Sequence, residues 1–137
     1  MYTWQTTITL RDADAAGVLF FARYLALAHD AYEAFLAANG LDTGRILREE
    51  SFLLPVVHAD ADYRAPLWVG DRVTVKLWAE TIKRRTFTIA YELRTSSDTL
   101  SCRARTTHVA VDKVARRAVV LPANLVTILE SIYIASA

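Results

Sequence analysis

Cysteine, histidine and long apolar runs are scarce in this sequence, and each shortage excludes a class of protein. The 137 residues include one cysteine, Cys102, so a disulfide framework is excluded and a reducing compartment, the cytoplasm, is expected. The three histidines, His29, His58 and His108, stand at no ligand-like spacing, so we expect no metal site. No stretch approaches the ~20 consecutive apolar residues that cross a bilayer, so no membrane association is expected.

A strong excess of either charge is also missing. The formal net charge of +1 gives no overall attraction to nucleic acid, so anion binding must come from a local cluster. Residues 1–10 alternate between apolar and polar side chains and lack a basic region followed by an apolar run, so we expect no secretory signal peptide. Repeats and shifts of composition are absent, and residues 1–137 are expected to form a single domain.

What the sequence does contain is a succession of strand patterns with one long helix near the start. Apolar residues at helical spacing from Tyr24 to Leu36, stopped by Asn39 and Gly40, predict a helix of about five turns. Alternating side chains predict strands over 3–11, 54–64, 72–83, 86–94 and 100–112, and shorter helical segments are expected over 43–50 and 123–134. This order predicts an α+β fold in which an antiparallel sheet of about five strands wraps around the long helix.

Two carboxylates, Asp12 and Asp14, precede the long helix. The simplest interpretation is that one of them caps the helix. The small residues that end at Gly17 would, however, let a ligand approach the backbone, and the apolar run from Leu19 to Phe21 would form a wall beside it. Free backbone N–H groups and the positive end of the helix dipole converge at a helix start, so a carboxylate there can attack a carbonyl that the amides polarise.

The spacing of this loop resembles a known family. Asp12, Asp14, Gly17, Phe21 and Tyr24 form the pattern Asp-x-Asp-x-x-Gly-x-x-x-aromatic-x-x-Tyr, which is similar to that of the 4-hydroxybenzoyl-CoA thioesterase family of hotdog-fold proteins. The likeness covers nearly the whole chain, through residues 54–58, 63–66, 70–71, 83–87 and 107–109. Within the family, residues 29–33 and 54–58 are most similar to the 1,4-dihydroxy-2-naphthoyl-CoA hydrolases of phylloquinone and menaquinone synthesis.

The resemblance implies a catalytic group and an oxyanion donor. Asp14 would be the catalytic carboxylate, as a nucleophile or as a base for water, and the backbone N–H of Phe21 would point at the thioester oxygen. Residue chemistry agrees, because a thiolate with a pKa of about 8.5 leaves without a general acid. One carboxylate and one oxyanion donor are therefore enough for thioester hydrolysis, and no cofactor is expected.

The resemblance also implies an acyl pocket. Many family members that act on short acyl chains carry histidine where this chain has Phe21. The absence of histidine at this position favours a flat apolar acyl group in the substrate. Phe20 and Tyr24 are expected to line the pocket, and His29 and His58 are weaker candidates. A lone histidine on a strand is more often structural than functional, which applies to His58 and His108.

Three consecutive cations, Lys83, Arg84 and Arg85, form the second candidate site. In an arbitrary protein such a run is more often the solvated tip of a hairpin. Coenzyme A carries a 3′-phosphate and a pyrophosphate that need such donors, and the family places CoA-phosphate contacts at this position. We therefore expect this run to bind CoA.

The leading hypothesis is an acyl-CoA thioesterase with an aromatic acyl preference that acts as a homodimer or homotetramer. The alternatives are a 4-hydroxybenzoyl-CoA or short-chain acyl-CoA thioesterase and, in another class, a non-enzymatic acyl-CoA sensor, which would keep the arginines without needing Asp14. No DNA-binding helix-turn-helix is attached, which weakens the sensor hypothesis. A dehydratase of the same fold needs a paired acid and histidine in a motif that the chain lacks.

Overall fold

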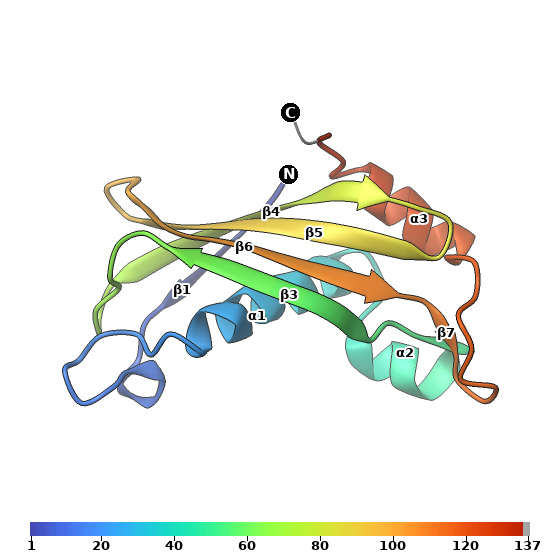
Figure 1. Ribbon diagram of the computed structural model, residues 1–137, viewed down its shortest axis with the longest axis horizontal. Coiled ribbons are helices and arrows are strands. Elements are labelled where there is room, and N and C mark those ends of the chain that lie inside the picture. Colours follow the sequence, from blue (N-terminus) through green and yellow to red (C-terminus); the bar gives the residue numbers. More distant parts are fainter. Residues whose placement is uncertain (136–137) are drawn as a thin grey trace.

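A five-stranded antiparallel sheet curves around one long helix in the computed structural model, which describes residues 1–135 (Figure 1). The strand order is β1-β4-β5-β6-β3, and the five antiparallel strands around one helix confirm the predicted hotdog fold. The sheet strands are β1 (Tyr2–Thr7), β3 (Val56–Tyr63), β4 (Arg72–Ile82), β5 (Thr86–Thr95) and β6 (Leu100–Val109). The helices are α1 (Arg23–Ala38), α2 (Thr43–Glu49) and α3 (Ala123–Glu130), and β2 (Phe52–Leu53) pairs with β7 (Val111–Asp112) in a small second sheet.

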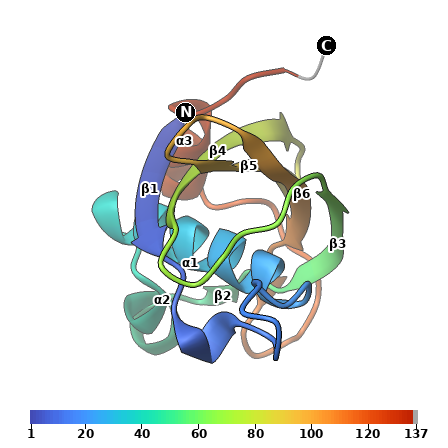
Figure 2. The same ribbon diagram turned by 90° about the vertical axis from the view of Figure 1, so that its left-hand side faces the viewer.

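The core lies between α1 and the concave face of the sheet. Viewed from the end, the helix runs along the inside of the curve with β1 and β3 on either side (Figure 2). Every second residue of β4 from Val73 to Ala79 is fully buried, so the alternation in the sequence identifies the inner face. On α1, Ala28 and Ala31 are also fully buried, and their small side chains let the helix lie close to the strands.

Four predicted boundaries are wrong. The strand predicted over 3–11 ends at Thr7, and Leu10–Asp12 forms one turn of 3₁₀ helix, which leaves Leu10 76 % exposed. The strand predicted over 54–64 begins at Val56, because Pro55 cannot donate to a ladder. The strand predicted over 100–112 is interrupted at Ala110, whose N–H bonds to the Arg85 carbonyl outside the β6 ladder. The last helix ends at Glu130 instead of residue 134, since the chain then pairs with the edge of β4 at Ala79.

The edge of the sheet formed by β3 is exposed. β3 lies beside β6 only, and Val56, Val57 and Tyr63 on it are 43 %, 59 % and 47 % exposed. The row Val56, His108, Phe87 and Ile82 crosses the sheet at one end, which is the end that carries the β4–β5 turn.

None of the helices described for residues 1–135 is long and apolar enough to cross a membrane.

Candidate active site

Asp14 lies at the tip of a small hairpin between β1 and α1. Ala13 pairs with Leu19 across it, and the Asp14 N–H donates to the Val18 carbonyl at 2.9 Å. Gly17 makes the turn with φ of +82°, a conformation that favours glycine. The Asp14 Oδ1 accepts from the Ala16 N–H at 2.8 Å, whereas Oδ2 has no partner within residues 1–135. The carboxylate is therefore exposed and held in place by its own loop, as a nucleophile or base requires.

Asp12 is buried and organises the same loop. Its Oδ1 accepts from Arg23 Nε at 3.1 Å and Nη2 at 2.7 Å, and its Oδ2 accepts from the Thr9 hydroxyl at 3.0 Å. Burial alone would raise the pKa of Asp12, but the hydrogen bonds from Arg23 and Thr9 outweigh it and lower the pKa below its ordinary value. Asp12 thus joins the end of β1 to the first turn of α1 as a carboxylate.

The amide of Phe21 is free to act as a donor. Leu19 N–H donates to the Leu67 carbonyl and Phe20 N–H donates to the Asp12 carbonyl, but no group among the described residues accepts from Phe21 N–H. Phe21 precedes α1, where the positive end of the helix dipole lies. Its carbonyl accepts from the Tyr63 hydroxyl at 3.0 Å, which ties the helix start to β3.

Aromatic side chains surround the free amide. A hollow of about 280 Å³ is lined by Leu19, Phe21, Tyr24, Tyr63, Arg64, Ala65 and Pro66. Tyr24 and Tyr63 meet edge to face at 5.0 Å, and Phe20 lies 4.8 Å from Phe21. Phe20 is 44 % exposed and Phe21 is 62 % exposed, so the two rings form an open apolar surface beside the donor.

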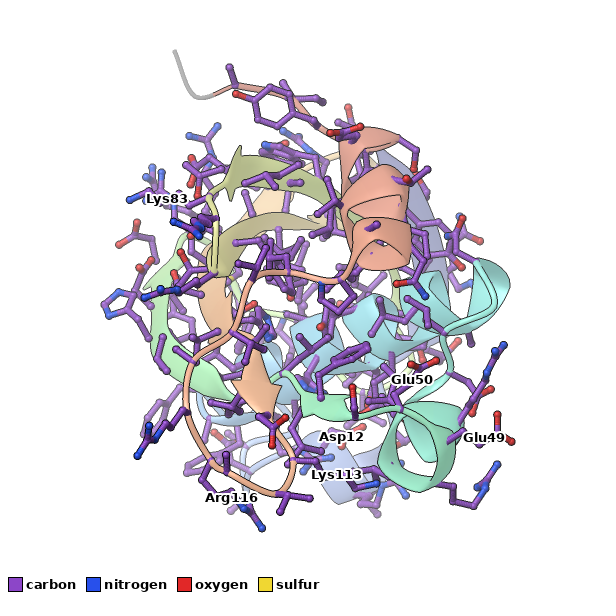
Figure 3. The ribbon with its side chains drawn as sticks, turned by 90° about the vertical axis from the view of Figure 1, so that its right-hand side faces the viewer. Asp12, Glu49, Glu50, Lys83, Lys113 and Arg116 are labelled. Atoms are coloured by element: carbon purple, nitrogen blue, oxygen red, sulfur yellow. The ribbon has the colours of Figure 1, made fainter. Side chains whose placement is uncertain are left out.

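The remaining predicted site residues lie elsewhere in the same chain. β4 starts beside the hairpin, where Trp68 pairs with Val18, and ends at the turn with Lys83, Arg84 and Arg85. Its 11 residues span about 35 Å at ~3.3 Å each. In Figure 3 Lys83 projects from the end of the molecule that faces the viewer. Asp14 and the cationic turn therefore lie at opposite ends of β4.

The cationic turn is exposed and held by its backbone. Lys83 N–H donates to the Thr86 carbonyl at 2.8 Å, and the carbonyls of Arg84 and Arg85 accept from Leu121 and Ala110. All three residues are exposed, as a hairpin tip would be, and CoA binding by their side chains stays a prediction.

The three histidines have different surroundings. His108 is fully buried, stacks on Phe87 at 4.8 Å, and is bonded through its two ring nitrogens to Thr106 and to the Leu54 carbonyl. Burial lowers the pKa of His108 to about 4, so this residue has the structural role expected for a lone histidine. His58 is exposed on β3 with Nε2 3.1 Å from Asp60. His29 lies in the middle of α1, beyond the Phe20, Phe21 and Tyr24 surface.

Sequence reasoning missed two residues of the site. Arg23 was not singled out, although a cation in the first turn of a helix opposes the dipole and so indicates a nearby acid. Tyr63 was noted only as part of a family motif. Its hydroxyl contact with the Phe21 carbonyl joins residues 42 positions apart, and no local pattern signals such a contact.

The sheet wrapped around one helix defines the class of hotdog-fold thioesterases, and comparison with known proteins agrees. Residues 8–129 match the Thioesterase-like superfamily, and the chain belongs to this family. It is 38 % identical over 133 residues to a 1,4-dihydroxy-2-naphthoyl-CoA hydrolase of Rippkaea orientalis (strain PCC 8801 / RF-1), with 96 % of each chain covered. It is 37 % identical over 126 residues to an enzyme of the same name from Picosynechococcus sp., covering 88 % of this chain and 86 % of that one. A crystal structure of a 1,4-dihydroxy-2-naphthoyl-CoA thioesterase from Synechocystis matches with a TM-score of 0.90 and 33 % identity over 96 % of both chains.

Proposed function

We propose that this chain hydrolyses 1,4-dihydroxy-2-naphthoyl-CoA to 1,4-dihydroxy-2-naphthoate and CoA, a reaction of phylloquinone and menaquinone biosynthesis. The observation that carries the proposal is the exposed Asp14 carboxylate on a hairpin whose other arm leads to the free Phe21 amide. The 38 % identity to a hydrolase of that name over 96 % of the chain supports the substrate.

Two routes are compatible with one carboxylate and one amide donor. In the covalent route an Asp14 oxygen attacks the thioester carbon, the C–S bond breaks to release CoA thiolate, and water then cleaves the mixed anhydride. In the general-base route Asp14 takes a proton from water, whose oxygen attacks the same carbon. Either way the Phe21 N–H stabilises the negative charge that develops on the carbonyl oxygen. CoA leaves as a thiolate, so neither route needs a cofactor.

The site is proposed to be shared between two chains that pair through β3. A twofold axis pairs two copies of one strand antiparallel, so the Tyr63 end of β3 lies beside the Val56 end of the partner strand. The Tyr63 end carries Asp14 and Phe21, and the Val56 end carries the cationic turn. Pairing thus brings the two half-sites together and covers the exposed edge, since an unpaired edge strand favours aggregation. A homotetramer would join two such dimers.

A substrate panel tests the proposed activity. We expect kcat/KM for 1,4-dihydroxy-2-naphthoyl-CoA to exceed that for 4-hydroxybenzoyl-CoA, and both to exceed butyryl-CoA and hexanoyl-CoA. The reason is that the open surface of Phe20, Phe21 and Tyr24 suits a flat ring. A short aliphatic thioester as best substrate would refute the aromatic assignment, and tight CoA binding without turnover would identify a sensor.

Mixed dimers test the shared site. Asp14→Asn removes the carboxylate from one chain, and the double variant Arg84→Ala, Arg85→Ala removes CoA contacts from the other. If each site takes these groups from different chains, a one-to-one mixture regains one intact site in each mixed dimer, roughly a quarter of the wild-type rate at low substrate. A rate no higher than the mean of the two separate variants would place both groups in one chain.

We also propose a cytoplasmic location. The lone Cys102 is buried and unbonded in the structure, as suits a reducing compartment. Fractionation of cells that express the chain would test this.

A further inference from the structure

A second pocket opens between α1, α2 and the small β2–β7 sheet. It has a volume of about 480 Å³ and is bounded by α1, α2, β2 and the turn after β7. Most of its wall is aliphatic, including Leu36, Ile46, Leu47, Leu53, Leu54 and Val111. Figure 3 shows Arg116 on the turn that follows β7. A largely apolar pocket of this size with a few polar groups is typical of a small-molecule site.

His29 and Glu33 supply polar groups to this pocket. His29 Nδ1 lies 3.2 Å from Glu33 Oε1, one turn further along α1. The carboxylate stabilises a proton on Nδ1, so Nε2 of the neutral ring is left as an acceptor. Nε2 has no partner in the part of the chain that the structure describes. The nearby Tyr32 hydroxyl is a second polar group of the wall that lacks a partner there, although Tyr32 is 3 % exposed.

The pocket lies at the Val56 end of β3, because Leu53, Leu54 and Pro55 lead into that strand. In a dimer paired through β3 it would face Asp14 of the partner subunit. An acyl group whose thioester lies at that carboxylate would therefore extend toward His29.

We propose that Glu33 is a specificity-determining residue, which holds His29 so that Nε2 accepts a hydrogen bond from a ring hydroxyl of the substrate bound at the partner's Asp14. This inference rests on the proposed function. The hydroxyl at C1 of the naphthoyl ring lies next to the thioester carbonyl and bonds to it internally. The hydroxyl at C4 has no such partner, so it is the group that His29 would bind. Glu33 acts through His29 and is a positioning residue.

A pair of substrates that differ in one hydroxyl tests the assignment. For the wild type we expect kcat/KM to be roughly tenfold higher for 1,4-dihydroxy-2-naphthoyl-CoA than for 1-hydroxy-2-naphthoyl-CoA, the size of one well-placed hydrogen bond. His29→Phe should bring this ratio close to one, mainly by slowing the dihydroxy substrate, and Glu33→Gln should lower it, because the carboxylate no longer fixes the proton of His29 on Nδ1. Wild-type ratios in both variants would overturn the proposal.

Glu49→Gln is the matched control. Glu49 forms a pair with Arg45 on α2 at the same spacing of four residues and the same distance of 3.2 Å, but it does not line the pocket. We expect Glu49→Gln to keep the wild-type ratio. A ratio reduced as much as in Glu33→Gln would indicate a general charge effect and overturn the role of Glu33.

A methyl ether separates accepting from donating by His29. The 4-methoxy analogue cannot donate a hydrogen bond, so the wild type should hydrolyse it no faster than 1-hydroxy-2-naphthoyl-CoA. Glu33→Gln should narrow that difference, because the amide of Gln can donate to Nδ1 and place the ring proton on Nε2. Equal rates for hydroxyl and methoxy substrates in the wild type would refute an acceptor at this position.

Mixed dimers show which chain supplies His29. When His29→Phe chains are co-expressed with an excess of Asp14→Asn chains, nearly every remaining Asp14 lies in a mixed dimer. Contact across the dimer predicts the wild-type substrate ratio, and contact within one chain predicts the His29→Phe ratio.

Absence of wild-type activity on both naphthoyl substrates would refute the proposed function itself. Failure of the ratio tests in an active wild type would refute only this inference.

Discussion

At the scale of single residues, Asp12 and Asp14 have different surroundings. Asp14 is exposed with one free oxygen, and Asp12 is buried and fully bonded. We predict that Asp14→Asn folds normally and lowers kcat by a factor of about a hundred or more, since the attacking carboxylate is lost. Steady-state kinetics and a thermal melt of the purified variant would check this. Near-wild-type turnover would exclude Asp14 as the catalytic group.

Asp12→Asn should show the converse pattern. The substitution weakens the contacts with Arg23 and Thr9, so we predict a lower melting temperature with a milder loss of turnover. The melting curve and kcat of this variant, measured beside those of Asp14→Asn, test which aspartate is structural and which is catalytic. If Asp12→Asn alone abolished activity while Asp14→Asn did not, the two roles would be reversed.

His108 makes the fold sensitive to acid. Burial lowers its folded pKa to about 4, whereas an unfolded histidine titrates near 6.5. Between these values the unfolded chain binds the additional proton, so the free energy of unfolding falls as the pH drops from about 6.5 toward 4. Urea midpoints measured across this range should fall more steeply for the wild type than for His108→Gln. Parallel curves for the two proteins would show that His108 does not cause the loss of stability at low pH.

At the scale of elements, the β4–β5 turn is proposed to bind CoA without taking part in the chemical step. Its cations would contact CoA equally in the ground and transition states. We therefore predict that the Arg84→Ala, Arg85→Ala substitutions raise KM more than they lower kcat. Added salt should likewise raise the KM of the wild type. An unchanged KM would identify the turn as a solvated hairpin tip.

The sequence predicts the elements better than it predicts their ends. Alternation in β4 and helical spacing in α1 are local and strong, so both elements occur as expected. The 3₁₀ turn at Leu10–Asp12 depends on the buried contact between Asp12 and Arg23, which are 11 residues apart. Tertiary contacts of this kind decide where strands stop, and a single sequence does not display them.

The same limit applies to the site. The Asp14 hairpin and the cationic turn are each recognisable from short motifs, because their residues are adjacent in the chain. Their separation by the length of β4 follows only from the register of the sheet. The sequence therefore predicts two local candidate sites without predicting that one chain holds them at opposite ends of a strand.

At the scale of the whole molecule, the exposed edge of β3 predicts the oligomer. We expect light scattering at micromolar concentration to give a dimer at least. A charge placed at the exposed Val57, as in Val57→Glu, should shift the population to monomer and remove activity together, because dimer formation would bury the new carboxylate beside the Tyr63 end of the partner strand. An active monomer would refute pairing through β3.

The length of β4 has a consequence for how the enzyme responds to dilution. Since Asp14 and the cationic turn lie at opposite ends of this strand, an isolated chain holds no complete site under the shared-site proposal. Below the concentration at which two chains associate, the rate should then rise with the square of the protein concentration instead of in proportion to it. Subunit association would in that case set how much of the synthesised protein is a catalyst at all.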